Sequence, residues 1–190
     1  MFDEPPDHSR PLAHPEHTAC LGLGSNVNPA RHLRRAIQRL RHIVTIESVS
    51  TAWQSPAVGS DAPDYLNAAL LVSTPMTREA LMAALKEIET NLGRDRTGGH
   101  VSLVAIDIDV VVFDDKILED DLWLHAYRAV PVAELMPGLC CPSTGDSLFE
   151  TAARLARDLT IKPRREILPR SPRPGTPRNG TLDSTRTRTP

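Results

Sequence analysis

The chain of 190 residues contains 22 Lys and Arg against 24 Asp and Glu, a length that suits one ordinary domain with tails rather than two full domains. Residues 163–190 hold seven Arg against two acids, which leaves a net charge of −7 on residues 1–162. A body this acidic is a poor general binder of nucleic acid, because neutralising phosphates requires a basic face.

Both ends of the chain are rich in proline and poor in apolar periodicity. Residues 1–17 contain four Pro and three His, and residues 163–190 contain six Pro among Ser, Thr, Arg and Gly. Such segments bury too little apolar surface to offset the entropy lost on ordering. We therefore expect a flexible leader over 1–17, a folded domain over 18–162 and a disordered basic tail over 163–190.

The folded region is expected to begin with a strand and a helix. Residues 18–23 form a short apolar run, and Asn28 followed by proline is typical of a helix start with a side-chain cap. Residues 43–53 alternate between apolar and polar side chains, which predicts a strand. Residues 54–64 are expected to form a loop, and the apolar residues 65–74 a central strand.

A second helix is expected between Thr77, which would cap it, and Gly93, which would end it. Apolar residues from Leu81 to Leu92 recur on one face of that segment. Residues 101–113 contain the most β-branched run of the chain and predict the last long strand.

The expected order is strand, helix, strand, strand, helix, strand. With right-handed crossovers this order favours an α+β fold, a ferredoxin-like sandwich with a βαββαβ core. Two helices would cover one face of a four-stranded antiparallel sheet. Additional C-terminal helices are expected near residues 131–136 and 146–157.

Two carboxylates stand two positions apart in the last expected strand. Asp107 and Asp109 would face one side of the sheet, because side chains alternate along a strand. Between apolar neighbours the two charges would repel each other unless a cation lay between them, and such hard oxygen ligands suit Mg²⁺. A solvated sheet face is the alternative, and the apolar neighbours favour the metal.

Other polar groups give weaker signals. Tyr65 and Asn67 would also face one way and suit a planar heterocycle, although a tyrosine at a strand start more often packs in a core. Arg94 and Arg96 follow the second helix and suit phosphate recognition, with a favourable helix-dipole interaction as an equally good alternative. The turn Gly22–Asn26 lacks the residues of a dinucleotide fingerprint or a P-loop and is not interpreted as a nucleotide loop.

Four short blocks occur in a recognisable order. They are LGLGSN at 21–26, PDYLNA at 63–68, IE with GRDR within 88–96, and DID at 107–109. Together they resemble the 6-hydroxymethyl-7,8-dihydropterin pyrophosphokinase family of folate biosynthesis. The resemblance extends from about residue 19 to residue 137, and the family has the ferredoxin-like core expected above.

The resemblance implies transfer of pyrophosphate from ATP to the hydroxymethyl group of the pterin, with AMP as the other product. Asp107 and Asp109 match the aspartates that hold two Mg²⁺ ions, and Arg96 is added to them as a catalytic residue. The pterin-binding positions are matched by Ser55, Pro56, Val58, Tyr65, Asn67 and Tyr127. The ATP-side positions are matched by Glu89, Arg94, Arg96, Val110 and His125.

The chain departs from the family pattern on the triphosphate side. Residues 98–105 lack the Trp and Arg that normally precede the two aspartates, and residues 122–129 are shortened, with His125 near the place of a family Arg. Trp123 and Arg128 are candidate substitutes. Because phosphoryl transfer depends on positioning and charge neutralisation, the alternative is a pterin-binding paralogue with weak or lost transferase activity.

The remaining features argue against other classes. An RNA-binding sheet ranks last, since the chain has only seven Phe, Tyr and Trp and an acidic body. No apolar run approaches the roughly 18–20 residues of a membrane span. Cys20, Cys140 and Cys141 have neither disulfide-framework nor zinc spacing. We expect a cytoplasmic protein that binds the pterin and ATP, and neither nucleic acid nor a membrane.

Overall fold

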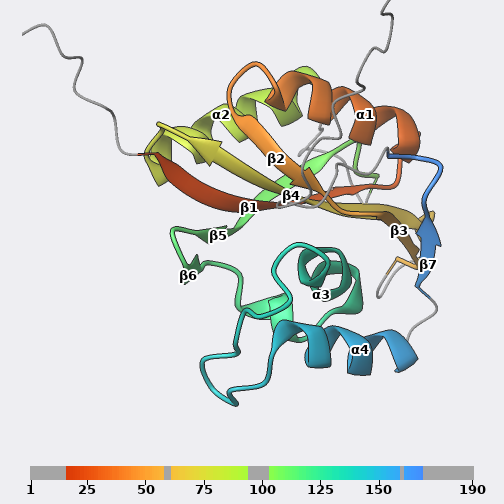
Figure 1. Ribbon diagram of the computed structural model, residues 1–190. Coiled ribbons are helices and arrows are strands. Elements are labelled where there is room, and N and C mark those ends of the chain that lie inside the picture. Colours follow the sequence, from red (N-terminus) through yellow and green to blue (C-terminus); the bar gives the residue numbers. More distant parts are fainter. Residues whose placement is uncertain (1–15, 58–60, 94–102, 159–160, 169–190) are drawn as a thin grey trace, which may run out of the picture.

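The computed structural model describes residues 16–57, 61–93, 103–158 and 161–168. In these parts of the chain a β-sheet lies between two pairs of helices (Figure 1). Helices α1 (Pro29–Leu40) and α2 (Arg78–Asn91) cover one face, and α3 (Ala126–Ala133) and α4 (Leu148–Asp158) lie on the other. None of the helices described has the length and apolarity needed to cross a membrane.

The strands of the sheet pair antiparallel throughout. They are β1 (His17–Ser25), β2 (Thr45–Val49), β3 (Ala52–Ser55), β4 (Tyr65–Thr74), β5 (Asp107–Phe113), β6 (Lys116–Ile117) and β7 (Lys162–Arg164). The order across the sheet is β6-β5-β1-β4-β3-β7, and β2 also pairs with β4. With β2 and β3 counted as one interrupted strand, the central order is that of a ferredoxin-like core, so the expected fold class is confirmed.

The two central strands are apolar on both faces because both faces are covered. Leu21 and Leu70 are fully buried and belong to the core beneath α1 and α2. Their neighbours Cys20 and Ala69 face the second core, where they meet side chains from the other helix pair such as Leu148. This double burial explains why residues 65–74 show a continuous apolar run rather than an alternation.

The helices of the first pair begin in different ways. The Thr77 side chain accepts a hydrogen bond from the Ala80 N–H (3.3 Å), as expected for a cap of α2. Asn28 instead takes a left-handed backbone conformation, with φ of 43°, and makes no side-chain cap. Its carbonyl oxygen accepts hydrogen bonds from Arg31 and His32, so the expected side-chain cap on α1 was wrong although the helix starts where predicted.

The single strand expected over 43–53 is divided at Ser50 and Thr51. The Ser50 hydroxyl accepts a hydrogen bond from the Ala69 N–H (2.8 Å), and the Thr51 N–H donates to Glu134 of the segment after α3 (3.0 Å). These side-chain bonds replace the regular ladder at this point. The chain therefore bends between β2 and β3, and β3 continues into the first two residues of the expected loop.

The strand expected over 101–113 begins only at Asp107; residues 101 and 102 lie outside the described residues. Just before it, the Val104 carbonyl accepts hydrogen bonds from the N–H groups of Asn26 (3.0 Å) and Val27 (3.3 Å). The Ser25 hydroxyl donates to the Ala105 carbonyl (2.6 Å). The backbone of 104–105 is thus bound by the last residue of β1 and the turn that follows it, and not by regular strand pairing.

Two later boundaries also differ from expectation. Helix α3 begins at Ala126, five residues before the predicted start, and contains Pro131 in its interior. Residues 163–168, predicted to be disordered, include most of β7 and the buried Leu168, while the Arg34 guanidinium donates to the Ile167 carbonyl (3.0 Å). Leu168 is part of the core and Ile167 packs against it. The proline-rich composition of the tail did not indicate that these two apolar residues would be at least partly buried. Residues 1–15 and 169–190 lie outside the described residues.

We expect Leu70→Ala to lower the free energy of unfolding by about 2–5 kcal/mol, because it leaves a cavity in the middle of β4. Leu70 is fully buried, whereas Leu124 is 67% exposed and provides a control. Urea unfolding followed by circular dichroism measures both variants. Equal stability of Leu70→Ala and Leu124→Ala would contradict the core assignment.

Candidate active site

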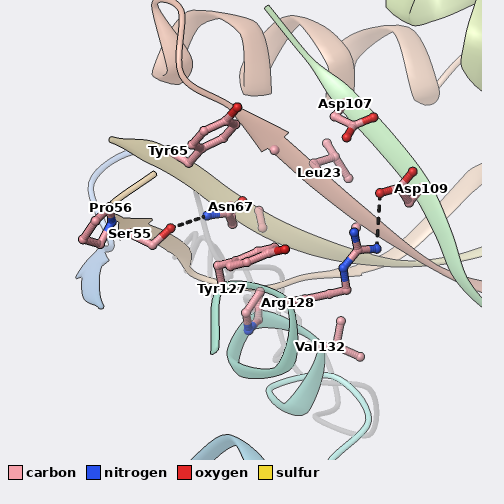
Figure 2. A pocket seen from close by; sticks show the side chains of 14 residues that line it. Leu23, Ser55, Pro56, Tyr65, Asn67, Asp107, Asp109, Tyr127, Arg128 and Val132 are labelled. Carbon is pink, nitrogen blue, oxygen red and sulfur yellow. Dashed lines mark hydrogen bonds and ion pairs between the residues drawn. The ribbon is translucent and has the colours of Figure 1, made fainter. Parts of the chain in front are cut away.

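A cavity of about 250 Å³ lies between the sheet and α3 (Figure 2). Strands β1, β4 and β5, the end of β3 and one face of α3 contribute to its wall. The lining residues are Gly22, Leu23, Gly24, Ser55, Pro56, Tyr65, Asn67, Ala68, Asp107, Asp109, Tyr127, Arg128, Pro131 and Val132.

Two tyrosines and an amide form one end of this cavity. Tyr65 at the start of β4 and Tyr127 on α3 lie on opposite sides, with Asn67 between them (Figure 2). The Asn67 Nδ2 donates to the Ser55 hydroxyl (3.0 Å), and both side chains are buried, so the carboxamide is held in one orientation. Burial raises the pKa of the Tyr127 phenol, which keeps this wall uncharged near neutral pH.

The glycines of β1 leave room for this arrangement. A Cβ atom at Gly24 would lie 3.2 Å from Asn67 Oδ1 and 3.9 Å from Tyr65 Cδ1. At Gly22 it would lie 3.2 Å from Val111 Cγ2. The Gly-Leu-Gly sequence therefore serves close packing beside the cavity.

Asp107 and Asp109 lie at the other end of the cavity (Figure 2). Both are partly exposed, whereas Ile108 and Val110 between and after them are buried, so the alternation predicted for this strand is present. Among the residues that the structure describes, no three His, Cys, Asp or Glu side chains are grouped so as to hold a metal ion. A cation here would have two carboxylates and would complete its ligand shell from other sources.

A second cavity, of about 520 Å³, runs between α2 and the outer edge of β5. Its lining residues are Arg78, Met82, Leu85, Lys86, Glu89, Asp107, Ile108, Asp109, Val110, Leu118 and Glu119. β6 pairs only with Val112 and Phe113, so within the described chain no strand covers the preceding part of β5. Asp107 and Asp109 line both cavities, which makes them the junction between the two.

Glu89 fixes the beginning of β5. Its side chain is only 2% exposed, and its Oε1 accepts a hydrogen bond from the Ile108 N–H (2.7 Å). Ile108 stands between the two aspartates, so the carboxylate of α2 determines where their backbone lies. The residue predicted for the ATP side thus borders the second cavity and also supports the acidic pair.

Arg128 brings a positive charge into the acidic end of the first cavity. Its Nη1 lies 3.2 Å from Asp109 Oδ2 and 3.4 Å from Glu119 Oε2, and its Nε lies 3.1 Å from Asp121 Oδ1 without hydrogen-bond alignment. The side chain is 16% exposed. Burial opposes its charge, but the three carboxylates outweigh that effect and raise the pKa of the guanidinium.

The other predicted site residues are placed less directly. His125 stacks on Tyr127, with ring centroids 5.1 Å apart and planes inclined by 13°, and does not itself line either described cavity. Ser55, Pro56, Tyr65, Asn67 and Tyr127 meet around the first cavity, whereas Glu89 and Val110 border the second. Val58, Arg94 and Arg96 lie outside the described residues.

Comparison with known proteins agrees with this architecture. The model of the 7,8-dihydro-6-hydroxymethylpterin-pyrophosphokinase (HPPK) family matches residues 20–137, more than half of the chain. The chain belongs to the HPPK family. The extent of the match is close to that expected from the four sequence blocks.

Curated relatives support the same membership. An enzyme of Methylorubrum extorquens named 2-amino-4-hydroxy-6-hydroxymethyldihydropteridine pyrophosphokinase is 32% identical over 149 residues, which cover 72% of this chain and 92% of the relative. A Synechocystis sp. protein of the same name is 27% identical over 145 residues, covering 70% and 74%.

A solved structure shows the same fold at low identity. The wild-type HPPK-DHPS of Plasmodium falciparum superposes with a TM-score of 0.59 at 10% sequence identity, covering 75% of this chain. This chain spans only 45% of that longer protein, so the comparison bears on the fold alone.

Several lining residues of this HPPK chain were not predicted as site residues. Arg128 was named only as a substitute on the phosphate side, and Gly24, Pro131 and Val132 were not named for the site. Tyr127 and Pro131 are four positions apart, as are Arg128 and Val132, so helical spacing from Tyr127 would have indicated this face of α3. The sequence alone did not exclude a strand or a loop at 127–130, and the helical spacing of these residues was therefore missed.

We expect Glu89→Ala to lower the free energy of unfolding by about 2 kcal/mol, because it leaves the buried Ile108 N–H without its acceptor. Glu89→Gln retains an oxygen acceptor and should lose less. Glu87→Ala is the control, since Glu87 is exposed on the same helix. Chemical denaturation measures all three, and no difference between Glu89→Ala and Glu87→Ala would exclude the anchoring role.

Proposed function

We propose that the protein transfers pyrophosphate from ATP to the hydroxymethyl group of 6-hydroxymethyl-7,8-dihydropterin, giving AMP and the pterin diphosphate. The observation that carries this proposal is that Asp107 and Asp109 line two adjoining cavities. A donor in one cavity and an acceptor in the other would meet at these carboxylates. The relatives from Methylorubrum extorquens and Synechocystis sp. are both named as pyrophosphokinases of this type of pterin, which supports the same reaction.

The pterin would occupy the first cavity. Tyr65 and Tyr127 offer aromatic surfaces on opposite sides, where a flat heterocycle stacks favourably. Asn67 presents a carboxamide whose orientation is fixed by Ser55, and an amide carries both a donor and an acceptor for the edge of the ring. The hydroxymethyl group would then lie towards the two aspartates.

ATP would occupy the second cavity. The open edge of β5 at Val110 offers backbone groups to a planar base, as the family resemblance assigns to this position. Arg78 and Lys86 of α2 place positive charge on the opposite wall, where phosphate groups would be stabilised. The resemblance assigns Arg94 and Arg96, which follow α2 in the sequence, to the same ligand.

Asp107 and Asp109 fit a magnesium site. They are hard oxygen donors on one face of β5, and Mg²⁺ commonly takes one or two carboxylates with phosphate and water oxygens for the rest. Two such ions, as the resemblance implies, would neutralise charge on the phosphates of ATP. The contribution of the chain itself is to hold the acceptor and the donor in line, which supplies much of the rate in such transfers.

The pterin-binding paralogue without transfer is less well supported. The relatives from Methylorubrum extorquens and Synechocystis sp., which match this chain over most of their length, are named as enzymes. Both cavities are also present in this chain. The proposal also includes the domain expected over 18–162, extended to about residue 168 by β7 and the buried Leu168, and a cytoplasmic location. The two alternatives differ in one measurable product, which is AMP.

We expect AMP to form when the protein is mixed with magnesium, ATP and the hydroxymethyl pterin. Asp107→Asn and Asp109→Asn should each reduce kcat by on the order of a hundredfold or more, since charge stabilisation worth several kcal/mol is lost. Asp146→Asn is the control, because Asp146 is exposed and lines neither cavity. Chromatography of AMP and of the pterin diphosphate measures turnover.

The same variants should still bind the pterin, because the stacking residues are unchanged. Pterin binding without AMP release from the unaltered protein would favour the paralogue. Full turnover in both aspartate variants at saturating magnesium would refute the metal assignment.

We expect Gly24→Ala to raise the Kd for the pterin by about tenfold, since its methyl group would press on the Asn67 carboxamide. Gly138→Ala is a matched control, because a Cβ there would meet nothing within 4 Å. Quenching of pterin fluorescence gives both dissociation constants. An unchanged Kd in Gly24→Ala would place the pterin elsewhere.

A further inference from the structure

Arg128 occupies a position that the proposed reaction does not account for. Its guanidinium contacts Asp109, one of the two carboxylates assigned to the metal, and it lines the cavity assigned to the pterin. In Figure 2 the side chain extends from α3 towards β5 and meets Asp109 at the boundary between these parts of the site. The positively charged Arg128 side chain is therefore already paired with Asp109, a proposed magnesium ligand.

The same guanidinium has two further acidic neighbours. Glu119 shares Nη1 with Asp109, and Asp121 faces Nε from the 3₁₀ turn at 120–123. Arg128 is the one cation among the described residues that line the first cavity. If Arg128 lost its contact with Asp109, two carboxylates would still neutralise its charge, so its release would not leave a buried charge unpaired.

A divalent cation and Arg128 would compete for Asp109. Both need the carboxylate oxygens at short distance, and two cations placed there together would repel each other. The double charge of the metal, with phosphate oxygens as additional ligands, favours the metal once nucleotide is present. Without nucleotide the internal pair has the advantage, because the guanidinium is held in place by α3 and needs no free cation.

We propose that Arg128 is a positioning residue that occupies Asp109 before a divalent cation binds and then shifts onto Glu119 and Asp121. The inference rests on the proposed function, since it takes Asp109 as a metal ligand. It implies that the acidic pair binds divalent cations weakly when alone and more strongly together with the nucleotide. Arg128 would thus tie loading of the metal to loading of ATP.

The test is a titration with Mn²⁺, whose free concentration is read by electron paramagnetic resonance, with and without a non-hydrolysable ATP analogue. We expect Arg128→Met to bind Mn²⁺ about tenfold more tightly than the unaltered protein when nucleotide is absent. With the analogue present, the difference should be smaller. Methionine keeps an unbranched stem in the packing of α3 and removes only the charged group.

Controls separate this inference from the proposed function. Arg154→Met removes an exposed arginine of α4 and should leave Mn²⁺ affinity unchanged. Asp109→Asn should lower Mn²⁺ binding in the presence of the analogue; if it does not, the metal assignment in the proposed function fails. If Asp109→Asn lowers binding but Arg128→Met leaves it unchanged or weaker, the metal site stands and the competition is refuted.

A second measurement follows Arg128 directly. The Arg128 Nε–H signal in a ¹⁵N-correlated NMR spectrum is identified by its loss in Arg128→Met. We expect this signal to shift when Mg²⁺ and the ATP analogue are added, because the guanidinium changes partners. A signal that stays in place while Mg²⁺ binds would show that Arg128 keeps its contacts, and it would overturn the proposal.

Discussion

Two like charges on one face of a strand, between apolar residues, are the constraint on which the rest of the site depends. Asp107 and Asp109 alternate with Ile108 and Val110, whose burial in the core beneath the helices fixes the side to which the acids point. A nearby cation reduces their repulsion, and in this structure the Arg128 guanidinium beside Asp109 supplies part of that charge. Strand β5 therefore contributes to both: Ile108 and Val110 pack in the core, and Asp107 and Asp109 line the candidate site.

Much of the surrounding sequence can be understood as support for that strand. Ser25 and Asn26 bind the backbone of 104–105 just ahead of it, and Glu89 binds the Ile108 N–H from the side of α2. Gly24, directly before Ser25, leaves the space into which the Asn67 carboxamide projects. The glycine-containing segment at 22–26 thus acts by leaving space for Asn67 and by hydrogen bonds to the backbone of 104–105.

The sequence predicts what depends on local periodicity. The two main helices, the central strands and the shared face of the two acids follow from the spacing of apolar residues, and the ferredoxin-like order follows from their succession. The failures lie where a side chain distant in sequence forms a hydrogen bond in place of the regular ladder, as at Ser50 and, through Ser25, before Asp107. The partners of Arg128 were likewise inaccessible, because its contacts with Asp109, Glu119 and Asp121 depend on how α3 packs against the sheet.

Helix α3 links the two halves of the site. Tyr127 and Arg128 are adjacent, so the aromatic wall of the first cavity and the counter-charge of Asp109 are carried by one turn of one helix. Glu134, just beyond that helix, accepts hydrogen bonds from the Thr51 N–H (3.0 Å) and the Trp53 Nε1 (2.7 Å), which ties the helix to the strand that bears Ser55. A displacement of α3 would therefore move Tyr127 in the aromatic wall and the Arg128 charge beside Asp109. Through Glu134 it would also disturb the strand that bears Ser55, the hydrogen-bond partner of Asn67. This geometry couples the position of the aromatic wall to the charge balance of the acidic pair, although the residues concerned lie in separate parts of the sequence.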